Sequence, residues 1–355
     1  MAATPGAWAT RLQTAWTERG PLARLLFPVS LVFGWFAGFR RLLYRSGMLR
    51  TQHLGLPVIV VGNLIAGGAG KTPAVIAIVR MLRGKGFHPG IVTRGYGRRE
   101  TGLVQVHADT PALVCGDEPL LLHLRTGAPV TVSRDRVAAA QALMHAHPQV
   151  DVLVSDDGLQ HLRLARDVQI LVFDERGAGN GWLLPAGPLR EPMPGRVPAR
   201  SLVLYNAPAP STTLPGTLAR RGLSGIVELA AWWQGAPAAR QPLQRLQGRS
   251  IIAAAGMARP QRFFDMLVDA GLDIETLPLP DHHDYATLPW PAQTPDVIVT
   301  EKDAVKLMPD RMTDTRVWVA ALDFTLGAEF DAALTALITT ARKPRREHDD
   351  GNPTA

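Results

Sequence analysis

The feature that most constrains the fold of this chain is a glycine-rich turn between a short apolar run and a helical pattern. Residues 58–61 are four β-branched residues and predict a buried strand. Glycines follow at positions 62, 67, 68 and 70, and residues 71–83 have a helical pattern opened by Lys-Thr-Pro. A strand, a glycine-rich turn and Gly-Lys-Thr at a helix start are typical of a phosphate-binding loop, where backbone N–H groups and the helix N-terminus hold the anion. The pattern predicts an α/β fold like that of the P-loop NTPases, with a mainly parallel sheet flanked by helices.

Within this loop, Lys71 is expected to reach the outer phosphates of a nucleotide and Thr72 to ligate the accompanying Mg²⁺. Pro73 suits the first helical turn, where its missing N–H costs nothing. A strict G-x-x-x-x-G-K-[ST] motif would have glycine at Ile65, so the alternative is a glycine-rich turn with a chance Gly-Lys-Thr. The flanking strand and helix favour the nucleotide site. Its predicted contacts are Gly67, Gly68, Ala69, Gly70, Lys71, Thr72 and Pro73.

The positive charge is concentrated near the N-terminus. The whole chain has a formal net charge of +7, and residues 1–56 hold seven arginines and one glutamate, which leaves the rest close to neutral. These arginines flank residues 25–39, an uncharged apolar run that is shorter than the ~20 residues a membrane-spanning helix needs. We therefore expect a helix that lies in, or partly inserts into, one leaflet, with arginines on the headgroups. The alternative is a core helix. A nucleic-acid binder would spread its basic residues over the folded domain, so none is expected as partner.

Titratable residues follow several predicted strands. Asp156 and Asp157 end the hydrophobic run 152–155, as a Walker B-type magnesium site requires, although an Asp-Asp-Gly turn is the simpler alternative. A histidine held by a carboxylate is a natural base for a hydroxyl group, because imidazole titrates near neutral pH. His282 or His283 could serve, paired with an Asp such as Asp117.

We expect four parts in the chain. An N-terminal membrane-associated helical segment covers residues 1–50, and a nucleotide-binding core covers 51–210. A smaller C-terminal α/β subdomain covers 211–340, although its stretch 217–248 reads as poor in strands, and 341–355 reads as a disordered tail. The single cysteine excludes an internal disulfide framework and fits a reducing compartment.

Taken together, seven motifs resemble those of the tetraacyldisaccharide 4′-kinase family, the lipid A 4′-kinases of Gram-negative bacteria. In chain order they are GNLIAGGAGKTP, TRGYGR, GDEP, SDDGLQH, LPAGPLREP, PDHHDY and TEKDAVK. The resemblance implies transfer of the ATP γ-phosphate to the 4′-hydroxyl of a tetraacylated glucosamine disaccharide 1-phosphate in lipid A biosynthesis. It also implies ATP and Mg²⁺ as cofactors.

The family's functional residues map onto this chain through these motifs. The resemblance implies that Asp117 and His282 form a pair that activates the acceptor hydroxyl, with Lys71 and Asp157 completing the catalytic set. It implies a metal site formed by Thr72, Asp156, Asp157 and Glu191, with a place near the lipid headgroup as the alternative for Glu191.

The resemblance also implies a location at the cytoplasmic face of the inner membrane, peripheral or monotopic, with a lipid substrate and no obligate protein partner. The rival function from another class is a membrane-recruited ATPase switch with a variant phosphate loop. Ala66 stands where such switches have their signature lysine, which disfavours that reading.

Overall fold

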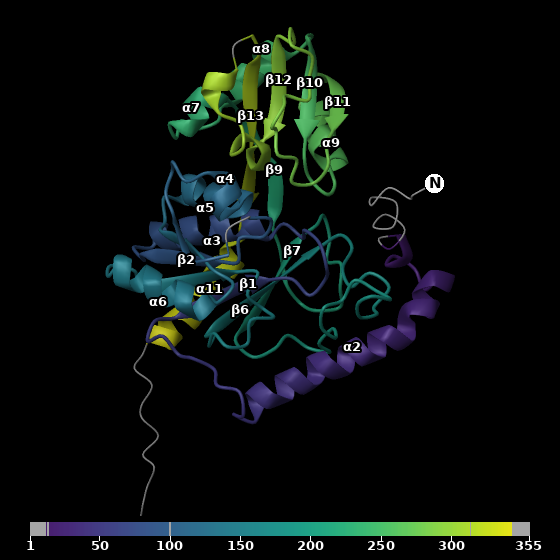
Figure 1. Cartoon of the computed structure of the whole chain (residues 1–355), viewed down its shortest axis with the longest axis vertical. Coiled ribbons are helices and arrows are strands. Elements are labelled where there is room, and N and C mark those ends of the chain that lie inside the picture. Colours follow the sequence, from purple (N-terminus) through teal and green to yellow (C-terminus); the bar gives the residue numbers. More distant parts are fainter. Residues whose placement is uncertain (1–11, 13, 99–100, 313, 343–355) are drawn as a thin grey trace, which may run out of the picture.

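The computed structural model describes residue 12 and residues 14–98, 101–312 and 314–342. Two β-sheets lie one above the other along the long axis of the molecule, and one long helix crosses its lower end (Figure 1). The lower sheet is built from residues between 58 and 218, and the upper sheet from residues between 220 and 325.

The lower sheet has eight strands in the order β3-β4-β2-β5-β1-β6-β7-β8. Every neighbouring pair is parallel except β3 and β4, so the carboxyl ends of β1, β2, β5, β6 and β7 meet at one edge. This confirms the predicted fold class. The strands are β1 Val58–Gly62, β2 Pro89–Thr93, β3 Val104–Val106, β4 Val130–Val132, β5 Val152–Asp156, β6 Val168–Asp174, β7 Ser201–Asn206 and β8 Thr217–Leu218.

Helices cover both faces of this sheet. Successive residues of its buried strands point to opposite faces, and the residues on both faces are apolar. In β1, Ile59 and Val61 share a core cluster with the helix that follows the phosphate loop, whereas Val58 and Val60 pack into the cluster on the other face. The helices of this part are α3 Lys71–Gly84, α4 Ala112–Cys115, α5 Asp117–Thr126, α6 Arg136–Ala146 and α11 Ala328–Arg342.

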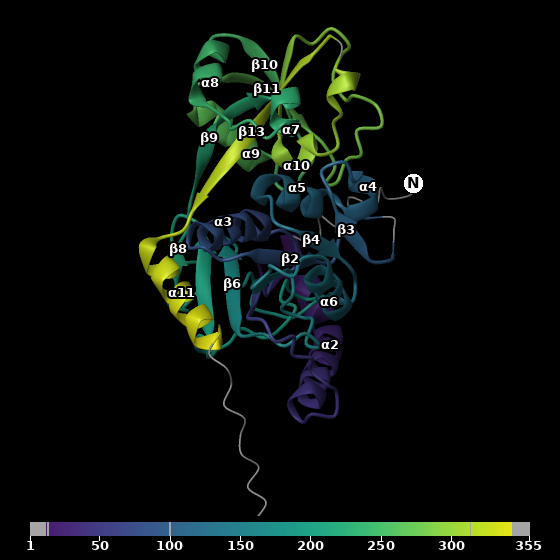
Figure 2. The same cartoon turned by 90° about the vertical axis from the view of Figure 1, so that its left-hand side faces the viewer.

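The upper sheet has five strands in the order β11-β10-β12-β13-β9, and only β9 is antiparallel to its neighbour. Figure 2 shows β9 and β13 running down toward the lower sheet, so this pair joins the two parts. The elements are β9 Arg220–Glu228, α7 Leu229–Trp233, α8 Arg240–Leu246, β10 Ser250–Ala255, α9 Gln261–Asp269, β11 Asp273–Pro278, β12 Asp296–Thr300, α10 Glu301–Ala304, the 3₁₀ helix η1 Pro309–Arg311 and β13 Arg316–Thr325.

The C-terminal half differs from the sequence prediction in three respects. The stretch 217–248 is not poor in strands, because it contains β8 and the nine-residue β9. Part of the expected subdomain 211–340 lies with the lower sheet: β8 pairs with β7, and α11 buries Phe330, Leu334 and Ile338, one face of a helix, in the core cluster of that sheet. Of the expected tail, residues 341 and 342 end α11, and 343–355 lie outside the described residues.

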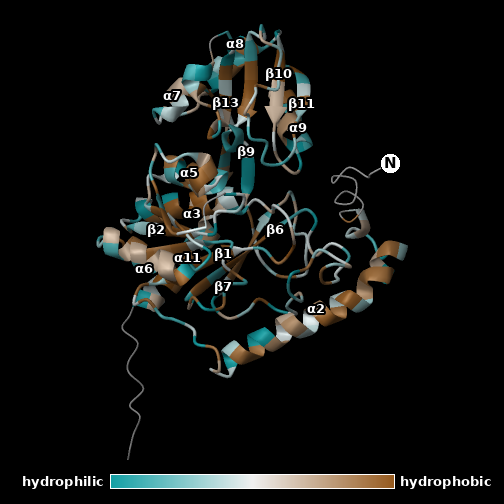
Figure 3. Ribbon diagram, viewed as in Figure 1, coloured by the Kyte–Doolittle hydropathy of each residue, from teal (hydrophilic) through white to brown (hydrophobic). Residues whose placement is uncertain are grey.

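The helix at the lower end is α2, Pro21–Arg45, 25 residues long. In the described part of the chain it alone is long and apolar enough to cross a membrane, and only 11% of its apolar window is buried. Figure 3 shows that many residues of this helix are hydrophobic. This exposure does not fit the alternative of a core helix. The exposed apolar side chains are Leu25, Val29, Leu31, Val32, Phe33, Trp35, Phe36, Phe39 and Leu42.

One side of α2 nevertheless packs on the loop that precedes Arg190. Ser30 Oγ donates a hydrogen bond to the carbonyl oxygen of Leu183 (2.9 Å), and the ring of Phe27 lies 4.5 Å from that of Trp182. A Cβ at Gly34 would come within 2.7 Å of Leu183, so glycine permits this close approach. The helix is thus fixed to the lower part along one face and free along the other.

Candidate active site

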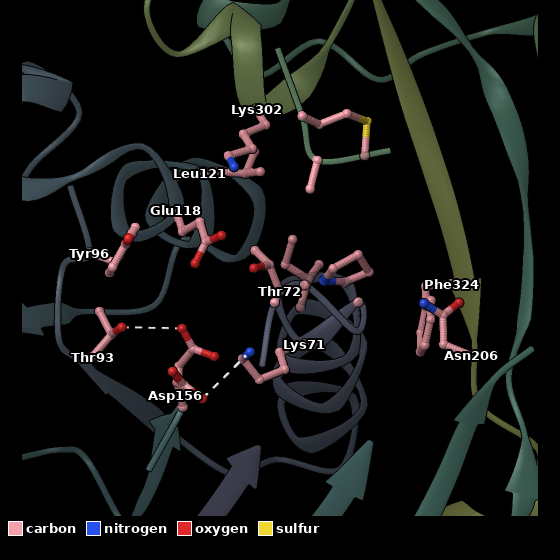
Figure 4. A pocket seen from close by; sticks show the side chains of 18 of the residues that line it. Lys71, Thr72, Thr93, Tyr96, Glu118, Leu121, Asp156, Asn206, Lys302 and Phe324 are labelled. Atoms are coloured by element: carbon pink, nitrogen blue, oxygen red, sulfur yellow. Dashed lines mark hydrogen bonds and ion pairs between the residues drawn. The ribbon is translucent and has the colours of Figure 1, made fainter. Parts of the chain in front are cut away.

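A cavity of about 1180 Å³ lies between the two sheets and reaches α2. Its wall includes Phe36 and Arg40 of α2, Lys71 of the phosphate loop, and Met257 and His282 of the upper part. The carboxyl ends of the parallel strands open into this space, which is where open α/β sheets bind their ligands. Figure 4 shows the region around Lys71.

The phosphate loop connects β1 to α3 at the floor of the cavity. Gly67 and Gly70 have φ angles of +89° and +80°, which glycine adopts without strain. Arg176 donates to the carbonyl oxygens of Ala66 (3.2 Å) and Gly68 (2.9 Å), so these two carbonyls of the loop are occupied by the guanidinium group. Ile65 is fully buried in a core cluster, which explains why this position holds an apolar residue instead of glycine.

Lys71, at the start of α3, points toward the end of β5 (Figure 4). Its Nζ lies 3.1 Å from Asn63 Oδ1 and 3.5 Å from Asp157 Oδ1. Arg190 Nη1 lies 3.2 Å from the same Asp157 oxygen. Burial alone would raise the pKa of Asp157, but the charges of Lys71 and Arg190 outweigh it and hold the pKa below its usual range. Asp157 is therefore an anion between two cations.

Asp156 ends β5 and is only 1% exposed. Thr93 donates to its Oδ2 (3.1 Å), while Oδ1 has no hydrogen-bond partner among the described residues. Burial and the nearby negative charges of Glu118 and Asp157 raise its pKa. Glu118, in the first turn of α5, faces Asp156 across the cavity (Figure 4). The sequence analysis missed Glu118, although it stands beside Asp117 in the GDEP motif.

Asp117 and His282 meet across the two parts of the molecule. His282 Nδ1 lies 3.0 Å from Asp117 Oδ2, at the N-terminus of α5. Burial would raise the pKa of Asp117, but the hydrogen bond with His282 and the charges of nearby lysines lower it overall. His283 instead accepts a hydrogen bond from the backbone N–H of Tyr285 (3.0 Å). The structure thus brings His282, and not His283, against the predicted carboxylate.

His282 has a φ of +61°, a left-handed conformation that is uncommon for a residue with a side chain. Its ring lies 5.6 Å from that of Tyr96, and its Nε2 lies 3.4 Å from Lys302 Nζ, which also binds Asp281 (2.8 Å). Because Nδ1 faces the carboxylate, it carries the proton in the neutral ring, which leaves the lone pair on Nε2.

Glu191, predicted as a metal ligand, has other partners. It accepts hydrogen bonds from Arg41 of α2 (2.9 Å) and from Gln160 (2.8 Å). Thr72 lines the cavity in the first turn of α3. Within the described ranges, no three His, Cys, Asp or Glu side chains are grouped closely enough to hold a metal ion. Glu191 therefore connects the site to α2 through Arg41. Its partners differ from those of Asp156 and Asp157.

Comparisons with known proteins identify the family of the chain. A family model described as Tetraacyldisaccharide-1-P 4′-kinase matches residues 22–339. The chain is 58% identical to a tetraacyldisaccharide 4′-kinase of Methylibium petroleiphilum over 95% of both chains, and 57% identical to one of Leptothrix cholodnii over 97% of this chain and 100% of the other. It also resembles the crystal structure of LpxK from Aquifex aeolicus in complex with ATP, with a TM-score of 0.73, 25% identity, and coverage of 89% of this chain and 99% of that one.

Proposed function

The chain belongs to the tetraacyldisaccharide-1-P 4′-kinase family, and from this premise we propose which reaction it catalyses and how. It is a phosphotransferase that moves the γ-phosphate of ATP to the 4′-hydroxyl of a tetraacylated glucosamine disaccharide 1-phosphate, a step of lipid A biosynthesis. One observation supports this most directly: the phosphate loop of the lower part and His282 of the upper part border the same cavity, and His282 is paired there with Asp117.

ATP is held by residues 67–73. The N–H groups of the loop and the positive end of α3 face the phosphates, and Lys71 is placed to neutralise the transferring group. When ATP arrives, its γ-phosphate competes with Asp157 for Lys71, because both are anions within reach of one ammonium group. Arg190 then remains as the partner of Asp157.

The residues around Asp156 fit Mg²⁺. Asp156 offers a buried oxygen without a hydrogen-bond partner in the described part of the chain. Burial and the neighbouring carboxylates raise the pKa of this carboxyl, so a cation beside it would stabilise its anion. Thr72, Asp156 and Asp157 would hold the ion together with the ATP phosphates, as Mg²⁺ prefers few protein ligands. Bound there, it would neutralise charge that develops on the phosphates. Glu191 would reach this site only by leaving Arg41.

The acceptor hydroxyl binds beside His282. The imidazole accepts the hydroxyl proton at Nε2, while Asp117 holds the Nδ1–H and stabilises the imidazolium that forms. Lys302 lies 3.4 Å from Nε2, so it has to give way to the hydroxyl and remains close to the reacting groups.

We place the protein at the cytoplasmic face of the inner membrane, with α2 in one leaflet. Because α2 packs along one face on the irregular loop near Leu183, it cannot cross the bilayer centre without taking the polar backbone groups of that loop into hydrocarbon. Its free apolar face suits the leaflet, and Arg40 and Arg41, which also line the cavity, suit phosphate headgroups. A lipid substrate can thus enter from the membrane side.

We propose that each part of the chain has the function predicted for it. Residues 1–50 anchor the protein, 51–210 hold the nucleotide, and 211–340 supply His282 and close the cavity, with α11 returning to the lower sheet. The rival function, an ATPase switch, is not favoured, because it gives no role to an Asp–His pair in the cavity.

The reaction is tested with purified protein, ATP, Mg²⁺ and an acylated glucosamine disaccharide 1-phosphate in detergent, with radiolabelled phosphate followed into the lipid. Lipid-dependent transfer by the wild type is expected. ATP hydrolysis without any labelled lipid would refute the kinase reaction and revive the switch.

A further inference from the structure

A buried lysine stands behind the Asp117–His282 pair. The side chain of Lys306 is only 6% exposed, and Lys306 is not among the described residues that line the cavity. Its Nζ lies 3.6 Å from Asp117 Oδ2, the oxygen that also faces His282 Nδ1. One carboxylate oxygen is thus held between an imidazole and an ammonium group.

The lysine is itself fixed by a second carboxylate. Asp303 is fully buried, and its Oδ1 lies 3.1 Å from Lys306 Nζ. Its other oxygen accepts hydrogen bonds from the backbone N–H of Gly256 (3.0 Å) and from Thr300 Oγ1 (2.7 Å). These two donors stand at the ends of β10 and β12, so the rigid upper sheet determines where the ammonium group lies.

We propose that Lys306 is a positioning residue that affects phosphate transfer only through Asp117. The inference rests on the proposed function. The groups involved form a chain of contacts from the upper sheet to α5 and back: Asp303, Lys306, Asp117 and His282.

The physical reason is the state that Asp117 needs for the reaction. It has to be ionised and correctly oriented so that His282 keeps its proton on Nδ1 and presents a lone pair at Nε2. Burial works against ionisation, and the neighbouring ammonium group of Lys306 works for it. Without Lys306, Asp117 would be free to protonate or rotate, while Lys71 and the phosphate loop would be unaffected.

The test is a double-mutant cycle on lipid phosphorylation with Lys306→Met and Asp117→Ala. Lys306→Met should lower kcat by roughly 10–100-fold and change the KM for ATP little. A loss of this size is usual when a group that orients the partner of a functional histidine is removed. In the Asp117→Ala background the same substitution should change kcat by less than about threefold, because the group through which it acts is gone. Lys85→Met, which removes a partly exposed lysine paired with Asp331, is the matched control and should keep the wild-type rate.

Lys306→Met leaves the buried Asp303 unpaired and can destabilise the fold. The cycle is therefore repeated with Asp303→Asn and Lys306→Met together, which leaves no lone buried charge, and ATP binding is measured for every variant. Wild-type kcat in these variants, or an equal loss with and without Asp117, would overturn the inference. A wild type that phosphorylates no lipid would refute the proposed function instead.

Discussion

Two adjacent histidines differ sharply in their surroundings. His282 lines the cavity and faces Asp117, whereas His283 accepts a hydrogen bond from a backbone N–H and its ring lies 4.8 Å from that of Tyr285. His282 lies in a turn with a left-handed backbone, and this local geometry gives the two neighbouring side chains different surroundings. The two residues can therefore serve as test and control in one experiment.

We predict that His282→Ala lowers kcat for lipid phosphorylation by roughly 10²–10⁴-fold, the range for loss of a general base, with ATP affinity unchanged. His283→Ala should stay within about threefold of wild type, because it removes only one hydrogen bond to the backbone. Steady-state kinetics and nucleotide titration measure both quantities. Equal losses in the two variants would contradict the assignment, and a loss of ATP affinity in His282→Ala would move this residue to the nucleotide site.

The single cysteine gives a second prediction at this scale. Cys115 is fully buried, and burial raises the pKa of its thiol to about 11, so on the order of one molecule in 10³ carries a thiolate at pH 8. A thiol reagent such as Ellman's should therefore leave native protein unmodified and fully active, and should titrate one thiol per chain in denaturant. Rapid labelling of the native protein would show that the end of α4 opens.

Site residues that belong to short sequence motifs could be predicted. Residues whose role depends on contacts with distant parts of the chain could not. Lys71 and Asp156 were predicted because each follows a recognisable strand. Glu118 and Lys306 were missed, although both lie inside quoted motifs, because their significance depends on neighbours far along the chain. Lys306 meets Asp117 only because two sheets face each other, and no local pattern encodes that contact.

The same limit applies to secondary structure. Strands of the lower sheet with continuous apolar runs, such as β1 and β5, could be predicted from composition alone. β9 could not, since it contains two glycines and arginines at its start, and its stability depends on pairing with β13, about 95 residues later in the chain. The conformation of β9 is therefore determined by its pairing with β13, a strand far along the chain.

At the level of one element, α2 carries the prediction for membrane binding. Trp35 and Phe39 are 63% and 46% exposed, with their rings stacked 5.5 Å apart on the free face. Replacing both by serine should weaken binding to anionic vesicles by roughly 10²–10⁴-fold, because each buried aromatic side chain contributes about 1.5–3 kcal/mol. Activity in detergent should persist. Vesicle sedimentation at low and high salt measures this.

The matched control for α2 is Val268→Ser, which removes an exposed apolar side chain from α9 on the upper part. It should bind vesicles as the wild type does. If high salt alone releases the wild type, the arginines hold the protein at the surface and α2 does not insert into the leaflet.

The whole molecule depends on contacts that join its two parts on either side of the cavity. Arg259 pairs with the buried Asp174 at the end of β6, and Arg125 of α5 pairs with Glu301 of α10. The Asp117–His282 pair lies in the same interface, so the proposed base is oriented only while the two parts remain together. The stability of the interface and the rate of the proposed phosphate transfer are therefore linked.

The Arg125–Glu301 pair gives the prediction for this scale. Both side chains are nearly buried, 13% and 8% exposed, and Trp232 Nε1 also donates to Glu301 (3.2 Å). Arg125→Met should lower the free energy of unfolding by about 3–5 kcal/mol, because it leaves a buried carboxylate unpaired. Arg125→Met with Glu301→Gln should recover most of that loss, since no buried charge remains. The exposed pair of Arg163 with Asp135 is the control, and Arg163→Met should change stability by less than about 1 kcal/mol. Urea unfolding followed by tryptophan fluorescence measures all four proteins. If Arg125→Met with Glu301→Gln is as unstable as Arg125→Met alone, then α5 and α10 need the ion pair itself, and its loss separates the two parts.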